Sequence, residues 1–146
     1  MPQRSVVAVG ASLLVASLAL AGCGSRSDDT EGTDTGSAEN KVAKIGVIAP
    51  LSGDLAALGK GIQNSVDLAI RQANEAKTIP GWTLELAAED DQATPDVGKN
   101  AATKLAADKD VVGVVGTLNS SVAQSVQPVL AAANIVQVSP ANTNPA

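Results

Sequence analysis

The sequence predicts an α/β fold, an open and doubly wound parallel sheet, in residues 41–146. Three observations support this fold class. Four short apolar segments suit buried strands, three segments between them place apolar residues at helical spacing, and the two kinds alternate along the chain. Parallel neighbours in a sheet need connections of helical length, which are nearly always right-handed crossovers. The alternation therefore favours a single parallel sheet with helices packed against it.

Four strands are predicted from apolar content and from the residues that end each segment. Residues 44–50 (KIGVIAP) form an apolar run that stops at a proline, which is typical of a strand buried on both faces. Residues 82–88 (WTLELAA) alternate, so their large apolar side chains are expected on one side. The third and fourth strands are expected at residues 111–115 and 135–138.

Three helices are predicted between these strands. The second begins at a Thr-Pro-Asp sequence (residues 94–96), which supplies a hydroxyl N-cap, a proline at the first helical position and an acid in the first turn, and it runs to about residue 107. The third covers residues 120–132, where Pro128 is expected to distort it. The first covers residues 62–76, with an inward apolar stripe made of Ile62, Val66, Ala69, Ile70 and Ala73.

The first 40 residues read as a targeting segment and a tether. Residues 1–22 have a short basic start, an apolar stretch of roughly 16 residues and a small-residue end, as in a secretory signal, and the stretch is shorter than the ~20 residues of a spanning helix. The sequence Leu-Ala-Gly-Cys at its end resembles the lipobox of bacterial lipoproteins, which implies that Cys23 is lipidated and anchors the protein on the extracytoplasmic side of the cell membrane. The alternative is a lone cysteine beside an ordinary signal sequence. Residues 23–40 lack Val, Ile, Leu and aromatic residues and carry five acids against one Arg, so a disordered acidic tether is expected.

Composition excludes several classes of function. The chain has no His and one Cys, so the common metal-ligand sets and catalytic groups that need imidazole cannot form. A net charge of -5 argues against a nucleic-acid partner. No G-x-G-x-x-G follows the first strand and no G-x-x-x-x-G-K-[ST] occurs, so no nucleotide cofactor is predicted. An acidic cluster at residues 89–91 could bind Mg²⁺, against the alternative of a solvated loop. We expect no catalytic residue, no cofactor and no metal.

The ends of the predicted strands are rich in hydroxyl and amide side chains. Such residues occur at positions 51–54, 117–121 and 139–143, where the carboxyl ends of parallel strands meet helix starts. Backbone N–H groups at a helix start, together with neutral hydroxyl donors, suit a small anionic group such as a carboxylate. The alternative is that Asn119 and Ser120 only cap a helix.

Several motifs together resemble one known family. A PLSG turn after the first strand, the EDD end of the second, a G-x-x-x-S-S junction after the third and an SPAxT end of the fourth fall in the same order as in the branched-chain amino-acid-binding proteins of ABC importers. The resemblance covers essentially all of residues 43–146. It implies two lobes of the periplasmic-binding-protein type I fold that close on a ligand, which the membrane permease then receives. Residues 41–146 would be a partial N-terminal lobe.

The resemblance also implies roles for five residues of a ligand site. Ser120 is similar to the serine that binds the ligand α-carboxylate through its hydroxyl and backbone N–H, and Leu118 would line the site. Ala141 and Thr143 are similar to the pair whose backbone groups and hydroxyl hold the α-ammonium and α-carboxylate. Leu58 stands where members often carry an aromatic residue over the ligand side chain.

Two lobes of typical size need roughly 300 residues, so the sequence is expected to be a fragment of a solute-binding lipoprotein, against the alternative of a complete but minimal domain. Other classes remain open: a sensing domain of the same fold for amides, urea or other small solutes, an Mg²⁺-dependent enzyme using Asp90 and Asp91, and a surface lipoprotein without ligand.

Overall fold

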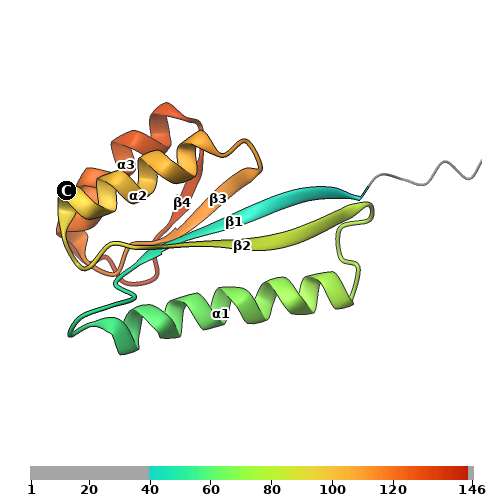
Figure 1. Ribbon diagram of the computed structural model, residues 1–146, viewed down its shortest axis with the longest axis horizontal. Helices are drawn as coiled ribbons and strands as arrows, with labels where there is room; N and C mark the ends of the chain where they lie inside the picture. The colour runs from blue at the N-terminus through green and yellow to red at the C-terminus, as the bar shows by residue number, and fades with distance from the viewer. Residues whose placement is uncertain (1–39, 145–146) are drawn as a thin grey trace, which may run out of the picture. The chain divides into compact units, whose positions relative to one another are not determined.

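A computed structural model describes residues 40–144 of the chain. The predicted signal (1–22) and Cys23 lie outside the described residues, as does all of the predicted tether except residue 40. Within the described part, a single layer of strands lies between one helix on one face and two helices on the other (Figure 1). The strands are β1 (Lys41–Ala49), β2 (Trp82–Asp90), β3 (Val111–Gly116) and β4 (Val136–Val138), and the helices are α1 (Ala56–Glu75), α2 (Pro95–Ala107) and α3 (Ser120–Ala132).

Every strand pair is parallel, and the sheet has the order β2-β1-β3-β4. This confirms the predicted fold class. The chain moves from β1 to β2 on one side and then to β3 on the other side of β1. The connections that follow β1 and β3 lead to helices on opposite faces of the sheet. A crevice is therefore expected between these connections, beyond the carboxyl ends of the two strands. α1 covers one face of the sheet, and α2 and α3 lie together on the opposite face (Figure 1).

Pairing with the central strand β1 explains why the second and third strands extend beyond their predicted ends at residues 88 and 115. β1 pairs with β2 residue by residue from Lys41↔Trp82 to Ala49↔Asp90, so the pairing continues to the polar Asp90 at the end of β2. β1 also pairs with β3, from Lys44↔Val111 to Ile48↔Gly116. Backbone pairing, which apolar content does not report, carries both strands beyond their hydrophobic segments.

The prediction for the first helix was wrong at its start. α1 begins at Ala56, six residues before the predicted Ile62. The two glycines near this end suggest a loop, but Gly59 is buried in the helix, and a Cβ added to it would lie 1.9 Å from the carbonyl oxygen of Pro50. Glycine is therefore needed there for close packing of α1 on the end of β1. Ala69, predicted to face inward, is exposed.

The second and third helices match their predicted bounds. Thr94 is the N-cap of α2 and Pro95 its first residue, although the Thr94 hydroxyl donates to the carbonyl of Gln92, 3.1 Å away, and not to the helix. α3 runs from Ser120 to Ala132 and includes Pro128. Both helices pack on β1 and β3 to form one buried cluster, made of Ile48, Ala101, Ala102, Leu105, Val111, Val114, Val122, Val126 and Leu130.

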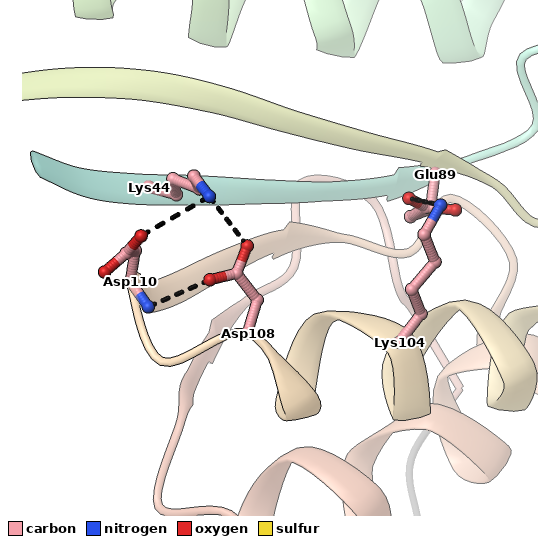
Figure 2. A network of polar contacts seen from close by, with 5 residues as sticks. All are labelled: Lys44, Glu89, Lys104, Asp108 and Asp110. Carbon is pink, nitrogen blue, oxygen red and sulfur yellow. Dashed lines mark hydrogen bonds and ion pairs between the residues drawn. The ribbon is translucent and has the colours of Figure 1, made fainter.

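Near the amino-terminal end of the sheet, charged side chains link β1 to the connection between α2 and β3 (Figure 2). Lys44 Nζ lies 2.9 Å from Asp108 Oδ2 and 3.5 Å from Asp110 Oδ2, and Asp108 Oδ1 accepts the backbone N–H of Asp110 at 3.0 Å. The bond to Asp108 raises the pKa of Lys44 and lowers that of Asp108. The contacts join the connection between α2 and β3 to β1, at the point where the β1–β3 register shifts after Lys44.

Candidate functional site

The structure brings Ser120 and Thr143 together at the carboxyl ends of β3 and β4. The backbone N–H groups of Thr143 and Asn144 each point at the hydroxyl oxygen of Ser120 at 3.3 Å. The oxygen accepts from both groups, so the Ser120 hydroxyl can still donate its own proton to a further acceptor. Ser120 is half-buried, at the first residue of α3.

The start of α3 has the electrostatic character of an anion site. Asn119 is the N-cap with extended backbone (φ −92°, ψ 131°), its side chain makes no capping hydrogen bond, and the first turn contains no acid. The first N–H groups of a helix have no partner within it, and the helix dipole places partial positive charge there. The Asn119 side chain does not cap this helix start, and the first turn of α3 carries no acid, so neither of them compensates its partial positive charge.

Asn142 connects the two loops that form the site. Its side-chain N–H donates to the carbonyl of Leu118 at 3.2 Å, and its Oδ1 accepts the hydroxyl of Ser139 at 2.6 Å. The backbone N–H of Asn142 donates in turn to the Ser139 hydroxyl oxygen at 2.9 Å. Sequence reasoning assigned no role to Asn142, and the Ser-x-x-Asn spacing after the fourth strand was the available signal. The loop after β4 is thereby held against the loop before α3.

A cavity of about 240 Å³ adjoins this junction. None of the described residues that line it is charged, so this wall offers neutral hydrogen-bonding groups and the start of α3. Its lining residues are Ser120, Ala123, Gln124, Gln127, Gln137, Ser139, Asn142 and Asn144.

Of the five predicted site residues only Ser120 lines this cavity, and the other four lie outside its lining. Ala141 is exposed beside Asn142. Leu58 is on α1, on the other face of the sheet, where it lines a separate groove of about 410 Å³ together with Val115 and Pro140. The structure thus brings together Ser120, Leu118 and Thr143, while Leu58 shares a groove with Pro140 of the loop after β4.

The acidic residues at the end of β2 do not converge on a common point. Glu89 pairs with Lys104 at 2.6 Å (Figure 2), and Asp90 accepts hydrogen bonds from the loop after β1. The Asp91 side chain is 0% exposed; one oxygen accepts the N–H of Ala93, and the other has no partner among the described residues. No group of three His, Cys, Asp or Glu side chains in residues 40–144 is placed to hold a metal ion. These carboxylates therefore have separate structural partners, which disfavours the Mg²⁺ interpretation.

Hydrogen bonds and burial separate the pKa values of the adjacent acids. Desolvation raises the pKa of Asp90, but hydrogen bonds from Ser52 and from the backbone N–H of Gln92 and Leu51 outweigh it and hold that pKa below its usual value. Burial raises the pKa of Asp91, and the charge of Asp90 adds to this effect against the single hydrogen bond from Ala93. Asp90 is thus the carboxylate that the fold stabilises in its charged form.

None of the helices within residues 40–144 combines the length and the apolar character that a bilayer crossing requires.

The model of a family described as "Periplasmic binding protein" matches residues 42–146. Among curated proteins, the chain is similar to the Leu/Ile/Val-binding protein BraC3 of Rhizobium johnstonii, with 38% identity over 101 residues; the match covers 69% of this chain and 27% of BraC3.

Solved structures show the same likeness. The branched-chain amino acid transporter substrate-binding protein LivJ of Streptococcus pneumoniae, in complex with isoleucine, superposes with a TM-score of 0.67 at 29% identity, over 71% of this chain and 30% of LivJ. A solute-binding protein of an ABC transporter from Rhodopseudomonas palustris, in complex with 3,4-dihydroxybenzoic acid, superposes with a TM-score of 0.61 at 29% identity, over 68% of this chain and 27% of that protein. The chain belongs to the periplasmic binding protein family, with the type I fold of the branched-chain amino-acid-binding proteins.

Proposed function

We propose that the protein is the substrate-binding component of an ABC importer and captures a small carboxylate-bearing solute. A branched-chain amino acid is the ligand that we propose. The observation that carries this proposal is the junction of Ser120 with Thr143 and Asn144 at the uncapped start of α3. A hydroxyl donor, backbone N–H groups and the positive end of a helix are the groups that bind a carboxylate without a charged side chain.

The two ligands named for the related structures support the emphasis on the carboxylate. Isoleucine and 3,4-dihydroxybenzoic acid have unlike bodies, and only isoleucine carries an ammonium group, but both carry a carboxylate. In this chain the Ser120 hydroxyl and the N–H groups at the start of α3 would hold that group, with the Thr143 hydroxyl beside it, while the Thr143 N–H donates to the Ser120 oxygen. The carbonyl of Ala141 would accept from an ammonium, and Leu118 and Leu58 would contact the ligand body.

The test compares ligands that differ at one group. Isothermal titration calorimetry on the full-length protein is run with leucine, isoleucine and valine, with leucinamide, which lacks the carboxylate, and with 4-methylpentanoic acid, which lacks the ammonium. Leucine binding with loss of leucinamide binding is the expected result. Equal affinity for leucine and leucinamide would contradict a carboxylate site, and binding of none of the five ligands would contradict the proposed function.

We further propose that the protein is anchored by a lipid on Cys23, on the extracytoplasmic side of the membrane, and delivers its ligand to the permease. The lipobox-like end of the apolar segment supports the anchor. Cells fed an alkyne fatty acid should label the wild-type protein in the membrane fraction and leave Cys23→Ser unlabelled. Equal labelling of the two forms would rule out this anchor.

A further inference from the structure

The Asp90 carboxylate, at the end of β2, is bonded to a loop far away in the sequence. Its Oδ1 accepts the backbone N–H of Leu51 at 2.8 Å, and its Oδ2 accepts the hydroxyl of Ser52 at 2.5 Å. A third donor, the backbone N–H of Gln92 at 2.9 Å, closes a local turn around the same Oδ1. The first two bonds span 39 and 38 residues of sequence, so Asp90 does more than close its own turn.

The loop that Asp90 holds connects β1 to α1 and sets where α1 begins. The Asp90 contacts fix its second and third residues, Leu51 and Ser52. The close approach of Gly59 to the carbonyl oxygen of Pro50 then sets α1 against the end of β1. Leu58 lies between these two constraints in the sequence and is 58% exposed. It lines a groove together with Pro140, which belongs to the loop that carries Thr143.

We propose that Asp90 is a positioning residue for the ligand site: its carboxylate fixes the β1–α1 loop, and through that loop the place of Leu58. The inference rests on the proposed function, because it assigns Leu58 to the ligand body. Hydrogen bonds to an ionised acceptor are shorter and stronger than neutral ones, and three of them on one carboxylate hold the loop in one geometry. Loss of the carboxylate leaves the Leu51 N–H and the Ser52 hydroxyl without their acceptor.

Four variants of the full-length protein separate positioning from charge. Asp90→Ala removes both oxygens, and Ser52→Ala removes one donor and serves as the milder change if Asp90→Ala does not fold. Asp90→Asn keeps an acceptor for the Leu51 N–H, and its amide can donate to the Ser52 hydroxyl oxygen. Asp54→Asn removes one negative charge from the same loop at an exposed position and is the matched control.

Two measurements are made on each variant. The first is amide hydrogen exchange of Leu51 together with the methyl chemical shifts of Leu58, measured by NMR without ligand. The second is leucine affinity measured by calorimetry. In Asp90→Ala we expect the Leu51 exchange rate and the leucine Kd each to rise about 10-fold or more, with Leu58 shifted, since the loss of hydrogen bonds to a charged group is of that size. Ser52→Ala should give a smaller change of the same sign, Asp90→Asn should stay within about 3-fold, and Asp54→Asn within about 2-fold.

These outcomes distinguish positioning of the loop by Asp90 from a general effect of negative charge. Unchanged Leu51 exchange in both Asp90→Ala and Ser52→Ala would overturn the proposal, and so would faster exchange with unshifted Leu58 resonances and unchanged affinity. A fall in affinity in Asp54→Asn equal to that in Asp90→Ala would show a charge effect and overturn positioning. If the wild-type protein binds no leucine, the proposed function is what fails. The Leu51 exchange and the Leu58 shifts still decide whether Asp90 positions the loop.

Discussion

The backbone N–H of Thr143 lies 3.3 Å from the hydroxyl oxygen of Ser120, which joins the loop after β4 to the first residue of α3. The two residues are 23 positions apart, and the parallel sheet brings them together because the carboxyl ends of β3 and β4 share one edge. The serine oxygen thus accepts N–H groups of the neighbouring loop. Under the proposed function, its own proton donates to the carboxylate of the ligand.

Ser120→Ala should lower the affinity for leucine about 10-fold or more, because it removes a hydrogen-bond donor to a charged group. Ser121→Ala is the matched control: Ser121 is exposed, next in sequence, and should change affinity by no more than about 2-fold. Calorimetry on the two variants of the full-length protein makes the comparison. Equal losses in the two variants would assign the effect to the helix start in general and contradict a specific role of the Ser120 hydroxyl.

Gly59 and Gly61 lie two residues apart in α1 and should respond oppositely to alanine. A Cβ at Gly59 would meet the Pro50 carbonyl oxygen at 1.9 Å, whereas nothing lies within 4 Å of one at Gly61. Gly59→Ala should lower the free energy of unfolding by about 1–3 kcal/mol through overpacking. Gly61→Ala should raise it by about 1 kcal/mol, since alanine is the better helix residue. Urea denaturation measures both, and a stable Gly59→Ala protein would show that the α1–β1 contact is looser than described.

Agreement between sequence and structure depends on how local the signals are. The bounds of α3 were predictable, because a polar Asn-Ser start and the spacing of Val122, Val126 and Leu130 are written within one segment. The start of α1 was not, because Gly59 looks like a loop residue until the Pro50 carbonyl that excludes a side chain is known.

At the candidate ligand site, too, local sequence signals were predictable and contacts between distant segments were not. Ser120 could be named from a strand-to-helix junction together with a family resemblance. The bond from Asn142 to the Leu118 carbonyl and the bonds from Leu51 and Ser52 to Asp90 join segments 24 to 39 residues apart. Local patterns do not report such pairs, because they arise from the strand order of the sheet.

Asp91 makes stability depend on pH in the sense opposite to Asp90. Burial raises the pKa of Asp91 in the folded protein, so folding stability from this group is full below the unfolded pKa of about 3.9 and is lost as pH rises through the folded pKa. Asp91→Asn keeps an acceptor for the Ala93 N–H and carries no charge. The variant should therefore gain stability relative to wild type as pH rises from about 4 towards 7.

Chemical denaturation of wild type and Asp91→Asn across that pH range measures the difference. Asp96→Asn, in the first turn of α2, is the control, and it should lose a few tenths of a kcal/mol to about 1 kcal/mol at neutral pH because an acid favours a helix start. A stability difference between Asp91→Asn and wild type that stays constant with pH would show that Asp91 titrates alike in the folded and unfolded chains.

Asn142 offers a test of whether the loop after β4 and the charge at the site act separately. Asn142→Ala removes the bonds to Leu118 and Ser139 without adding charge, so the loop that carries Thr143 should loosen and leucine affinity should fall. Asn142→Asp cannot donate to the Leu118 carbonyl and also places a negative charge on the wall of the cavity that Ser120 lines. Its affinity for leucine should therefore fall further than that of Asn142→Ala, and the excess loss should shrink at high salt, which screens partly exposed charges.

Asn100→Asp, exposed on α2, controls for net charge and should leave affinity within about 2-fold. If Asn142→Ala and Asn142→Asp lose equal affinity at every salt concentration, the site has no charge preference at this wall, and the carboxylate must be held elsewhere.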